Sequence, residues 1–497
     1  MLSTVWDYVV VGGGLAGSVI SSRMLEYNSS LNILLIEAGE DTRSRTDILY
    51  TNATNLMGGE LDWQYPTKPV SALNDRSLVY TKAKAWAVAL RSTLVDYDEW
   101  AEIVGDSRWS YDSQLPWMKK AEDWFSTNST AQHGNGGPLH VASVTSTGRN
   151  AGENLGRAEL TETRRNGLRE FTPVIYPLDG ITVLTDTLVE RIILAKNCSD
   201  GELRATGVQL ANGTQISSKN VILAAGAYRS LQLLMLSSIG DSEELQKHNI
   251  SKLKNPEKGL ALGSDNPLFS QPEFATGYPI DWVVSTDIDK TGLAAAIAKD
   301  EGAVPDAATH SLLKTGRSFL ENFIIYQAYS ASNPTVPLDG SHIYTNVVSF
   351  LPTSHGTVGL ECTSPATGPV INLNYLKTEV DRYVYREGIR QMTKVMLNTT
   401  FGKEFITGEN APNAFEPVSL DDTDDYLNSH LAAVVTTWHP HGTCSMGKVV
   451  DSEFKVKGVK GLRVVDASVL PVPMAAHLMA PLYAMAEQAA AIITDNA

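Results

Sequence analysis

The chain has 497 residues, a formal net charge of −16 and three cysteines. This length is too great for one hydrophobic core, so two large domains are expected. The acidic balance, without clusters of Lys and Arg, argues against nucleic acid as a partner. No apolar run is long and pure enough to predict a transmembrane helix. The cysteines are odd in number and lack CxxC spacing, which indicates neither a zinc site nor a disulfide framework.

Two features give opposite indications of localisation. The first expected strand begins a few residues after Met1, which leaves no room for a signal peptide and favours an intracellular protein. Asn-x-Ser/Thr sequons instead favour a glycoprotein of the secretory pathway, if a leader was removed or is not recorded. The seven sequons begin at Asn28, Asn52, Asn128, Asn197, Asn212, Asn249 and Asn398. The sequence leaves both possibilities open.

The first expected elements are a β-strand, a tight turn and a helix. The run Trp6-Asp-Tyr-Val-Val-Val-Gly-Gly-Gly-Leu-Ala-Gly17 is apolar up to its glycines, and the residues that follow have a helical pattern. Gly12 allows the turn, Gly14 lets the backbone approach a pyrophosphate, and Gly17 lets the helix pack closely on the strand. The N–H groups that open the helix are free to bind phosphates.

A second strand follows at the spacing of a βαβ unit. It is the run Asn32-Ile-Leu-Leu-Ile-Glu37, and its final residue can accept hydrogen bonds from an adenosine ribose. A GxGxxG motif alone would fit many glycine-rich turns in α/β proteins. Strand, glycines, helix and acidic residue agree here, so the sequence predicts a dinucleotide site.

The middle of the chain returns to this sheet. A hairpin-like segment, 181–194, runs into 205–213, where Asn212-Gly213 is a hairpin-turn signal. The strand Asn220-Val-Ile-Leu-Ala-Ala-Gly226 is expected to add to the parallel sheet, and the helix Ser230-Leu-Gln-Leu-Leu-Met-Leu236 follows it.

Polar and apolar residues alternate between about Leu268 and Tyr426, notably in 341–350 and 356–361, which predicts antiparallel strands of a substrate domain. A buried strand over 461–468 and a helix over 481–492 then return to the cofactor domain. The predicted fold is α/β with an antiparallel sheet (α+β), a Rossmann-like dinucleotide-binding domain interleaved with a substrate domain. The first domain is assigned to 1–65, 180–265 and 427–497, and the second, with cofactor-covering loops, to 66–179 and 266–426.

Eight stretches together resemble the glucose-methanol-choline (GMC) family of flavin oxidoreductases, and its fungal alcohol-oxidising branch, such as the aryl-alcohol oxidases and dehydrogenases, most closely. They extend over nearly the whole chain and are Val9 to Gly17 with Glu37, Asp62-Trp-Gln-Tyr65, Asp96-Tyr-Asp-Glu-Trp100, His133-Gly-Asn-Gly-Gly-Pro138, Ala224-Ala-Gly-Ala-Tyr-Arg-Ser230, Leu351-Pro-Thr-Ser-His-Gly-Thr-Val-Gly-Leu360, His439 to Gly447, and Leu462-Arg-Val-Val-Asp-Ala-Ser-Val-Leu-Pro471.

The resemblance implies FAD as cofactor, a small-molecule alcohol as substrate, and oxygen or another compound as electron acceptor. His439 matches the family's catalytic base and His477 its second active-site position. An imidazole suits the removal of a hydroxyl proton while the carbon-bound hydrogen leaves as hydride. His441 is expected to support them, and no metal is needed. The predicted cofactor-binding residues are Gly12, Gly14, Leu15, Ala16, Gly17, Glu37, Val189, Ala225, Asp466 and Ala467.

Two departures from the family pattern leave three functions open. Relatives carry a Gly-Gly-Ser-Ser loop before the Asp-Tyr-Asp-Glu-Trp motif and an Asn-Leu-Gln-Asp-His segment later, whereas this chain is shortened around 82–91 and 260–267. Both losses lie where the flavin would be held. The favoured hypothesis is a FAD-dependent alcohol oxidase or dehydrogenase. The alternatives are a non-redox acid–base cyclase or dehydratase of fungal secondary metabolism on the same scaffold, and an inactive relative.

Overall fold

The computed structural model describes most of the chain. The described residues are 5–43, 45, 48, 59, 61–80, 93–125, 131–143, 156–159, 161–165, 168–196, 202–240, 280, 282–325, 342–411 and 415–495. The shortened segments around 82–91 and 260–267 lie outside them.

The parallel part of the main sheet is built from strands far apart in the chain. β1 (Trp6–Val11) pairs with β2 (Ile33–Ile36) on one side and with β13 (Gln215–Leu223) on the other. β10 (Thr182–Leu184) extends the sheet beyond β2, and β20 (Leu462–Val464) pairs with β13. The middle strands are apolar because helices and loops cover both faces of the sheet. The predicted return of the chain to this sheet is therefore confirmed.

An antiparallel extension continues from β13. β12 (Leu203–Leu210) pairs with β13 through the Asn212-Gly213 turn, as predicted, and Gly213 has a φ of +85°. β11 (Val189–Lys196) pairs with β12, and β19 (Val459–Lys460) runs parallel to β12. The expected hairpin over 181–194 is wrong, because β10 pairs with β2 while β11 pairs with β12. Apolar alternation does not reveal which partner a strand takes.

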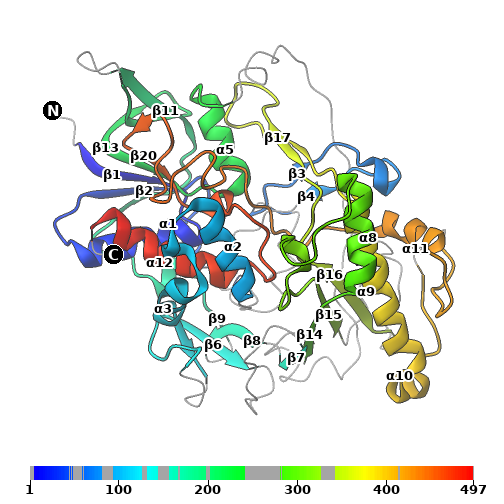
Figure 1. Cartoon of the computed structure of the whole chain (residues 1–497). Helices are drawn as coiled ribbons and strands as arrows, with labels where there is room; N and C mark the ends of the chain where they lie inside the picture. Colours follow the sequence, from blue (N-terminus) through cyan, green and yellow to red (C-terminus); the bar gives the residue numbers. More distant parts are fainter. Residues whose placement is uncertain are drawn as a thin grey trace.

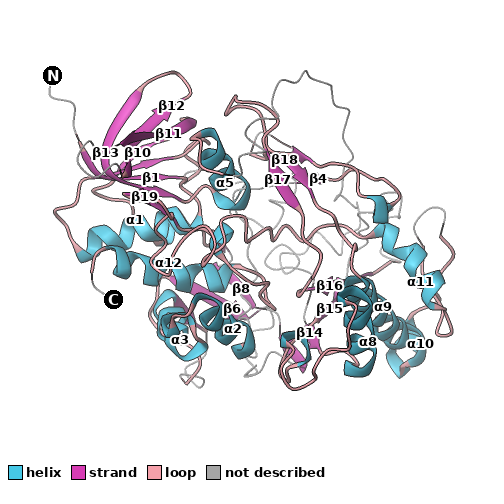
Figure 2. Cartoon of the chain, turned by 45° about the horizontal axis from the view of Figure 1, so that its top comes forward, coloured by secondary structure: helices cyan, strands magenta, loops and turns pink. Residues whose placement is uncertain are grey.

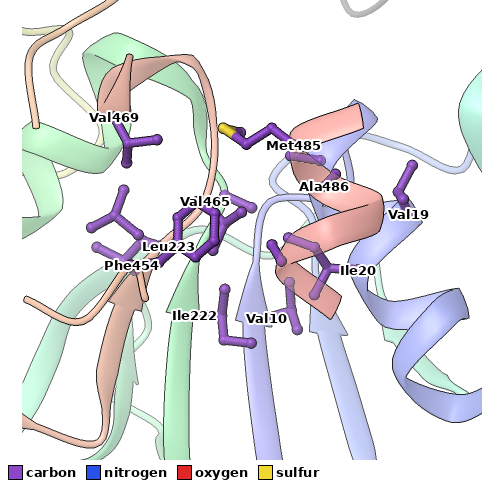
Figure 3. Close-up of a cluster of buried hydrophobic side chains, with 14 of the residues drawn as sticks. Val10, Val19, Ile20, Ile222, Leu223, Phe454, Val465, Val469, Met485 and Ala486 are labelled. Atoms are coloured by element: carbon purple, nitrogen blue, oxygen red, sulfur yellow. The ribbon is translucent and has the colours of Figure 1, made fainter. Parts of the chain in front are cut away.

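Helices cover the main sheet and complete its core. α1 (Leu15–Tyr27) packs against α12 (Met479–Ile493), and α12 also contacts α3 (Tyr111–Ala121). Figure 3 shows Val19 and Ile20 of α1, and Met485 and Ala486 of α12, gathered above Val10 of the sheet. α2 (Leu94–Val104) lies beside α3, and α5 (Gly226–Leu236) follows β13.

A second, antiparallel sheet has the order β16 (Tyr344–Ser349), β15 (Leu320–Ile325), β14 (Trp282–Thr286) and β7 (Gly156–Glu159). α9 (Glu379–Asn398) packs on β15 and β16, and α8 (Lys290–Glu301) packs on α9. In Figures 1 and 2 this assembly lies on the right and the main sheet on the left. The α/β fold with an added antiparallel sheet is confirmed, whereas the exact domain bounds stay a prediction.

Smaller elements surround these two sheets. β5 (Glu122–Trp124), β6 (Leu139–Ser143), β8 (Thr161–Arg165) and β9 (Leu168–Arg169) form a third sheet, β3 (Tyr65–Pro66) pairs with β4 (Val79–Tyr80), and β17 (Thr357–Gly359) pairs with β18 (Val370–Asn372). The other α-helices in the described part of the chain are α4 (Thr172–Ile175), α10 (Thr400–Phe405) and α11 (Asp424–His430). Within the described ranges, the helices are too short or too polar to cross a membrane.

Candidate active site

The predicted dinucleotide-binding residues lie at the carboxyl ends of the parallel strands, where ligands bind in open α/β sheets. Gly12 has a φ of +108°, and a Cβ added there would lie 2.4 Å from the carbonyl oxygen of Ala224. A Cβ on Gly17 would lie 1.9 Å from the carbonyl oxygen of Gly12. Both positions therefore require glycine for close packing, as the sequence predicted for Gly17.

The start of α1 has the features of a phosphate site. Gly14 is the N-cap residue, and no side chain caps the N–H groups of the first turn, which begins with Leu15 and Ala16. A Cβ added to Gly14 would meet nothing within 4 Å, so the surface beside this residue is open. Unpaired N–H groups and the helix dipole favour an anion here. These residues fit the pyrophosphate of a dinucleotide.

Glu37 stands beside the same turn. Its Oε2 accepts a hydrogen bond from the N–H of Gly13 at 2.8 Å, and its Oε1 accepts one from Gly39 at 2.8 Å. The backbone carbonyl of Glu37 also accepts from Thr187, which leads the chain toward Val189 at the start of β11. The structure thus brings three predicted cofactor-binding segments together at one end of the sheet.

Asp466 and Ala225 connect this end of the sheet to α5. One carboxylate oxygen of Asp466, Oδ2, accepts from the N–H of Gly226 at 2.8 Å and from the Ser230 hydroxyl at 2.5 Å. The other, Oδ1, accepts from the N–H of Ser468 at 2.9 Å. The side chain of Asp466 is thus occupied in holding the backbone, which leaves backbone groups of this segment as the ones to approach a cofactor.

The turn that carries His439 is attached to the segment after Asp466. The N–H groups of Gly442, Cys444 and Met446 donate to the carbonyls of Ala467, Ser468 and Val469, respectively, at 2.8 to 3.1 Å. This ladder places His439 next to the cofactor end of the main sheet. Trp438, directly before it, is 40% exposed and has a φ of +61°, an uncommon backbone conformation for a bulky residue.

His439 and His477 converge although 38 residues separate them. Nε2 of His439 lies 3.2 Å from Nδ1 of His477, and their ring planes are inclined at 83°. The ring of Phe350 packs edge-on against His477. The predicted meeting of the two imidazoles is therefore present in the structure.

Glu321 is a third member of this cluster that the sequence analysis missed. Its Oε1 lies 2.9 Å from Nε2 of His477, and its side chain is 1% exposed. Glu321 belongs to β15, in the second sheet, so it reaches the site from outside the cofactor region. A signal was available, because the adjacent polar pair Glu321-Asn322 interrupts an apolar strand and one of the two must face inward.

The neighbouring His441 contacts the backbone of His439, its Nδ1 lying 3.2 Å from that carbonyl oxygen. The residue keeps some exposed surface, but protein atoms surround its ring. Loss of hydration lowers the pKa of His441, although the hydrogen bond to the His439 carbonyl acts in the opposite direction. Burial likewise raises the pKa of the Cys444 thiol to about 12, which makes it an inert core residue.

Two further histidines, His133 and His140, have contacts within the fold. The ring of His133 stacks on that of Trp124, with 3.7 Å between the ring centroids. Its Nδ1 lies 3.1 Å from Oε1 of Glu122. His140 contacts Asp123, also at 3.1 Å. Both pairs lie in or beside the third sheet, which supports assigning them to the fold.

Comparison with known families and structures agrees with this geometry. The GMC oxidoreductase models match residues 161–255 and 352–486. The chain is 35% identical to the GMC-type oxidoreductase acuG of Aspergillus aculeatus, covering 98% of this chain and 99% of that one. It is 30% identical to pyranose dehydrogenase 3 of Leucoagaricus meleagris, covering 99% and 93% of the two chains.

Solved structures share the fold. Formate oxidase of Aspergillus oryzae superposes with a TM-score of 0.82 at 23% identity, covering 99% of this chain and 98% of that one. A fungal aryl-alcohol oxidase superposes with a TM-score of 0.75 at 20% identity, covering 99% of each chain. The predicted family and its cofactor, FAD, are thereby confirmed, and the chain belongs to the GMC oxidoreductase family.

Proposed function

We propose that this protein oxidises an alcohol to a carbonyl compound, with His439 as the base that accepts the hydroxyl proton. The observation that carries the proposal is the contact between Nε2 of His439 and Nδ1 of His477, beside the cofactor end of the main sheet. Relatives named pyranose dehydrogenase and choline dehydrogenase support a substrate with a CH–OH group. Bound FAD supplies the hydride acceptor.

The side chains provide the proton chemistry. Because an ionised carboxylate can only accept hydrogen bonds, Glu321 favours the form of His477 that carries a proton on Nε2. One proton lies between Nδ1 of His477 and Nε2 of His439. His439 acts as the base when this proton sits on Nδ1 of His477, because the lone pair on its own Nε2 is then free. A substrate hydroxyl that reaches these two nitrogens finds an acceptor for its proton and a second imidazole that orients its oxygen.

The test compares the visible absorption and the turnover of purified variants. The wild-type protein should show flavin bands that bleach when 4-methoxybenzyl alcohol or D-glucose is added without oxygen. H439A should lower turnover about 100-fold or more, the usual contribution of a general base, while its FAD content stays unchanged. H430A changes a histidine of α11 that contacts the carbonyl of Glu416 and serves as the control. Full activity of H439A would disprove the assignment of the base.

One observation favours a second candidate, the non-redox acid–base cyclase. The alignment with acuG extends over 528 positions although this chain has 497 residues, so segments of the relative have no counterpart here. The Glu321, His477 and His439 cluster would still move protons without a flavin. A colourless protein that converts a polyketide-type substrate, and loses this activity in H439A, would establish that alternative.

A further inference from the structure

A buried carboxylate from α2 holds the backbone that leads to His477. Oδ2 of Asp96, which is 0% exposed, accepts a hydrogen bond from the N–H of Ala475 at 3.1 Å. Ala475 is buried and precedes His477 by two residues. The same oxygen accepts from the N–H and hydroxyl of Thr93 at 3.2 and 2.6 Å. One carboxylate thus caps α2 and fixes the segment that carries His477.

Arg317 joins Asp96 to the strand that carries Glu321. Nη1 of Arg317 lies 3.2 Å from Oδ1 of Asp96, and the two side chains are 2% and 0% exposed. A second nitrogen, Nη2, contacts Glu99. Arg317 precedes Glu321 by four residues, at the approach to β15. Since an arginine remains charged when buried, Arg317 needs a buried carboxylate partner here, and Asp96, unlike the more exposed Glu99, provides it.

We propose that the Asp96–Arg317 pair is a positioning device for His477, an inference that rests on the proposed role of this histidine. Glu321 holds the imidazole ring, and Asp96 holds the main chain two residues earlier. Asp96 contacts Arg317, and His477 contacts Glu321, so both contacts are made to the short stretch from Arg317 to the first residues of β15. Because an acid–base group must stay within about 0.5 Å of its productive position, losing the main-chain attachment misplaces the ring. Asp96 acts through His477 and touches no reacting atom.

A double-mutant cycle tests this connection. Turnover of 4-methoxybenzyl alcohol and of D-glucose is measured with a dye as electron acceptor for D96A, H477A and the double variant. D96A should lower kcat about tenfold or more, and it should add less than about twofold in the H477A background. Fully additive losses would overturn the proposal. An H477A protein with undiminished turnover would instead contradict the proposed function.

E99Q is the matched control, because Glu99 contacts Arg317 but not Ala475. It should change kcat less than about twofold, as expected for a change outside the attachment to His477. A loss as large as that of D96A would mean that any weakening of the Arg317 cluster impairs the enzyme, and would also overturn the proposal. Thermal unfolding of each variant separates misfolding from misplacement.

A measurement without substrate gives an independent answer. In protein labelled with ¹³C at the histidine Cε1 atoms, the resonance of His477 is identified by its absence in H477A. It should shift in D96A and stay in place in E99Q. An unmoved resonance in D96A would contradict the proposal even if neither alcohol is turned over. If D96A does not fold, D96N, which keeps the size of the side chain, is judged by the same criteria.

Discussion

Nε2 of His477 lies 2.9 Å from Oε1 of Glu321, a residue 156 positions earlier in the chain, in β15 of the second sheet. The contact joins the C-terminal segment of the cofactor region to the antiparallel sheet. The distance between Glu321 and His477 therefore depends on how the antiparallel sheet packs against the cofactor region.

The first prediction concerns the charge of Glu321. E321Q keeps the shape of the side chain but replaces the carboxylate that faces Nε2 of His477 with a neutral amide. It should lower kcat about tenfold or more and leave FAD content unchanged. N322A alters the next residue of β15, whose amide donates to Gln391 instead, and it should keep normal turnover. Equal losses in both variants would indicate damage to the strand.

The second prediction separates folding from cofactor binding at the glycine turn. G17A places a methyl group 1.9 Å from the carbonyl oxygen of Gly12, so it should destabilise the protein by about 3 kcal/mol in urea unfolding. G14A places its methyl group in open space. It should fold normally but release FAD more readily, which fluorescence of the freed flavin would detect. Normal FAD retention in G14A would argue against a pyrophosphate in front of α1.

The third prediction concerns stability in acid. The pKa of His441 is lowered from 6.5 in the folded protein, so the unfolded chain binds the proton more readily. Stability is then fully present above pH 6.5 and falls as the pH drops below it. H441V should remove this part of the loss, seen as a flatter dependence of the urea midpoint on pH. An unchanged slope would show that other groups cause the acid sensitivity.

The fourth prediction concerns a buried charge between three helices. The side chain of Glu487 in α12 is 0% exposed. It forms ion pairs with Arg23 of α1 at 2.8 Å and with Lys120 of α3 at 3.1 Å, and it accepts a hydrogen bond from the Tyr176 hydroxyl at 2.8 Å. E487Q leaves two cations beside a neutral amide. It should lower the free energy of unfolding by about 3–5 kcal/mol. E26Q, at the exposed partner of Arg23, should cost less than about 1 kcal/mol.

Local patterns predicted the cofactor region well, because its signals are short-range. The first 37 residues contain the glycine turn, Glu37 and the order strand, helix, strand. Buried parallel strands are also uniformly apolar, which makes them easy to recognise. The convergence of His439 and His477 was predicted from a family resemblance, since 38 residues separate the two imidazoles.

What the sequence did not reveal depends on partners far away. Glu321 has the same local pattern whether it faces water or His477, and only the packing of β15 decides between them. Asp96 is similar, because it looks like an ordinary capping residue of α2 until the backbone of Ala475 reaches it. The misassigned pairing of β10 has the same origin, since β2 precedes it by about 150 residues.

The arrangement of β1 and β20 on either side of β13 has a consequence for biosynthesis. The 239 positions from Leu223 to Leu462 have to be synthesised after β13 before the parallel sheet gains its last strand. At about 5–20 residues per second this takes roughly 12–48 s. Throughout that time the nascent polypeptide exposes the open edge of β13. We therefore expect this strand edge to be a binding site for chaperones during translation.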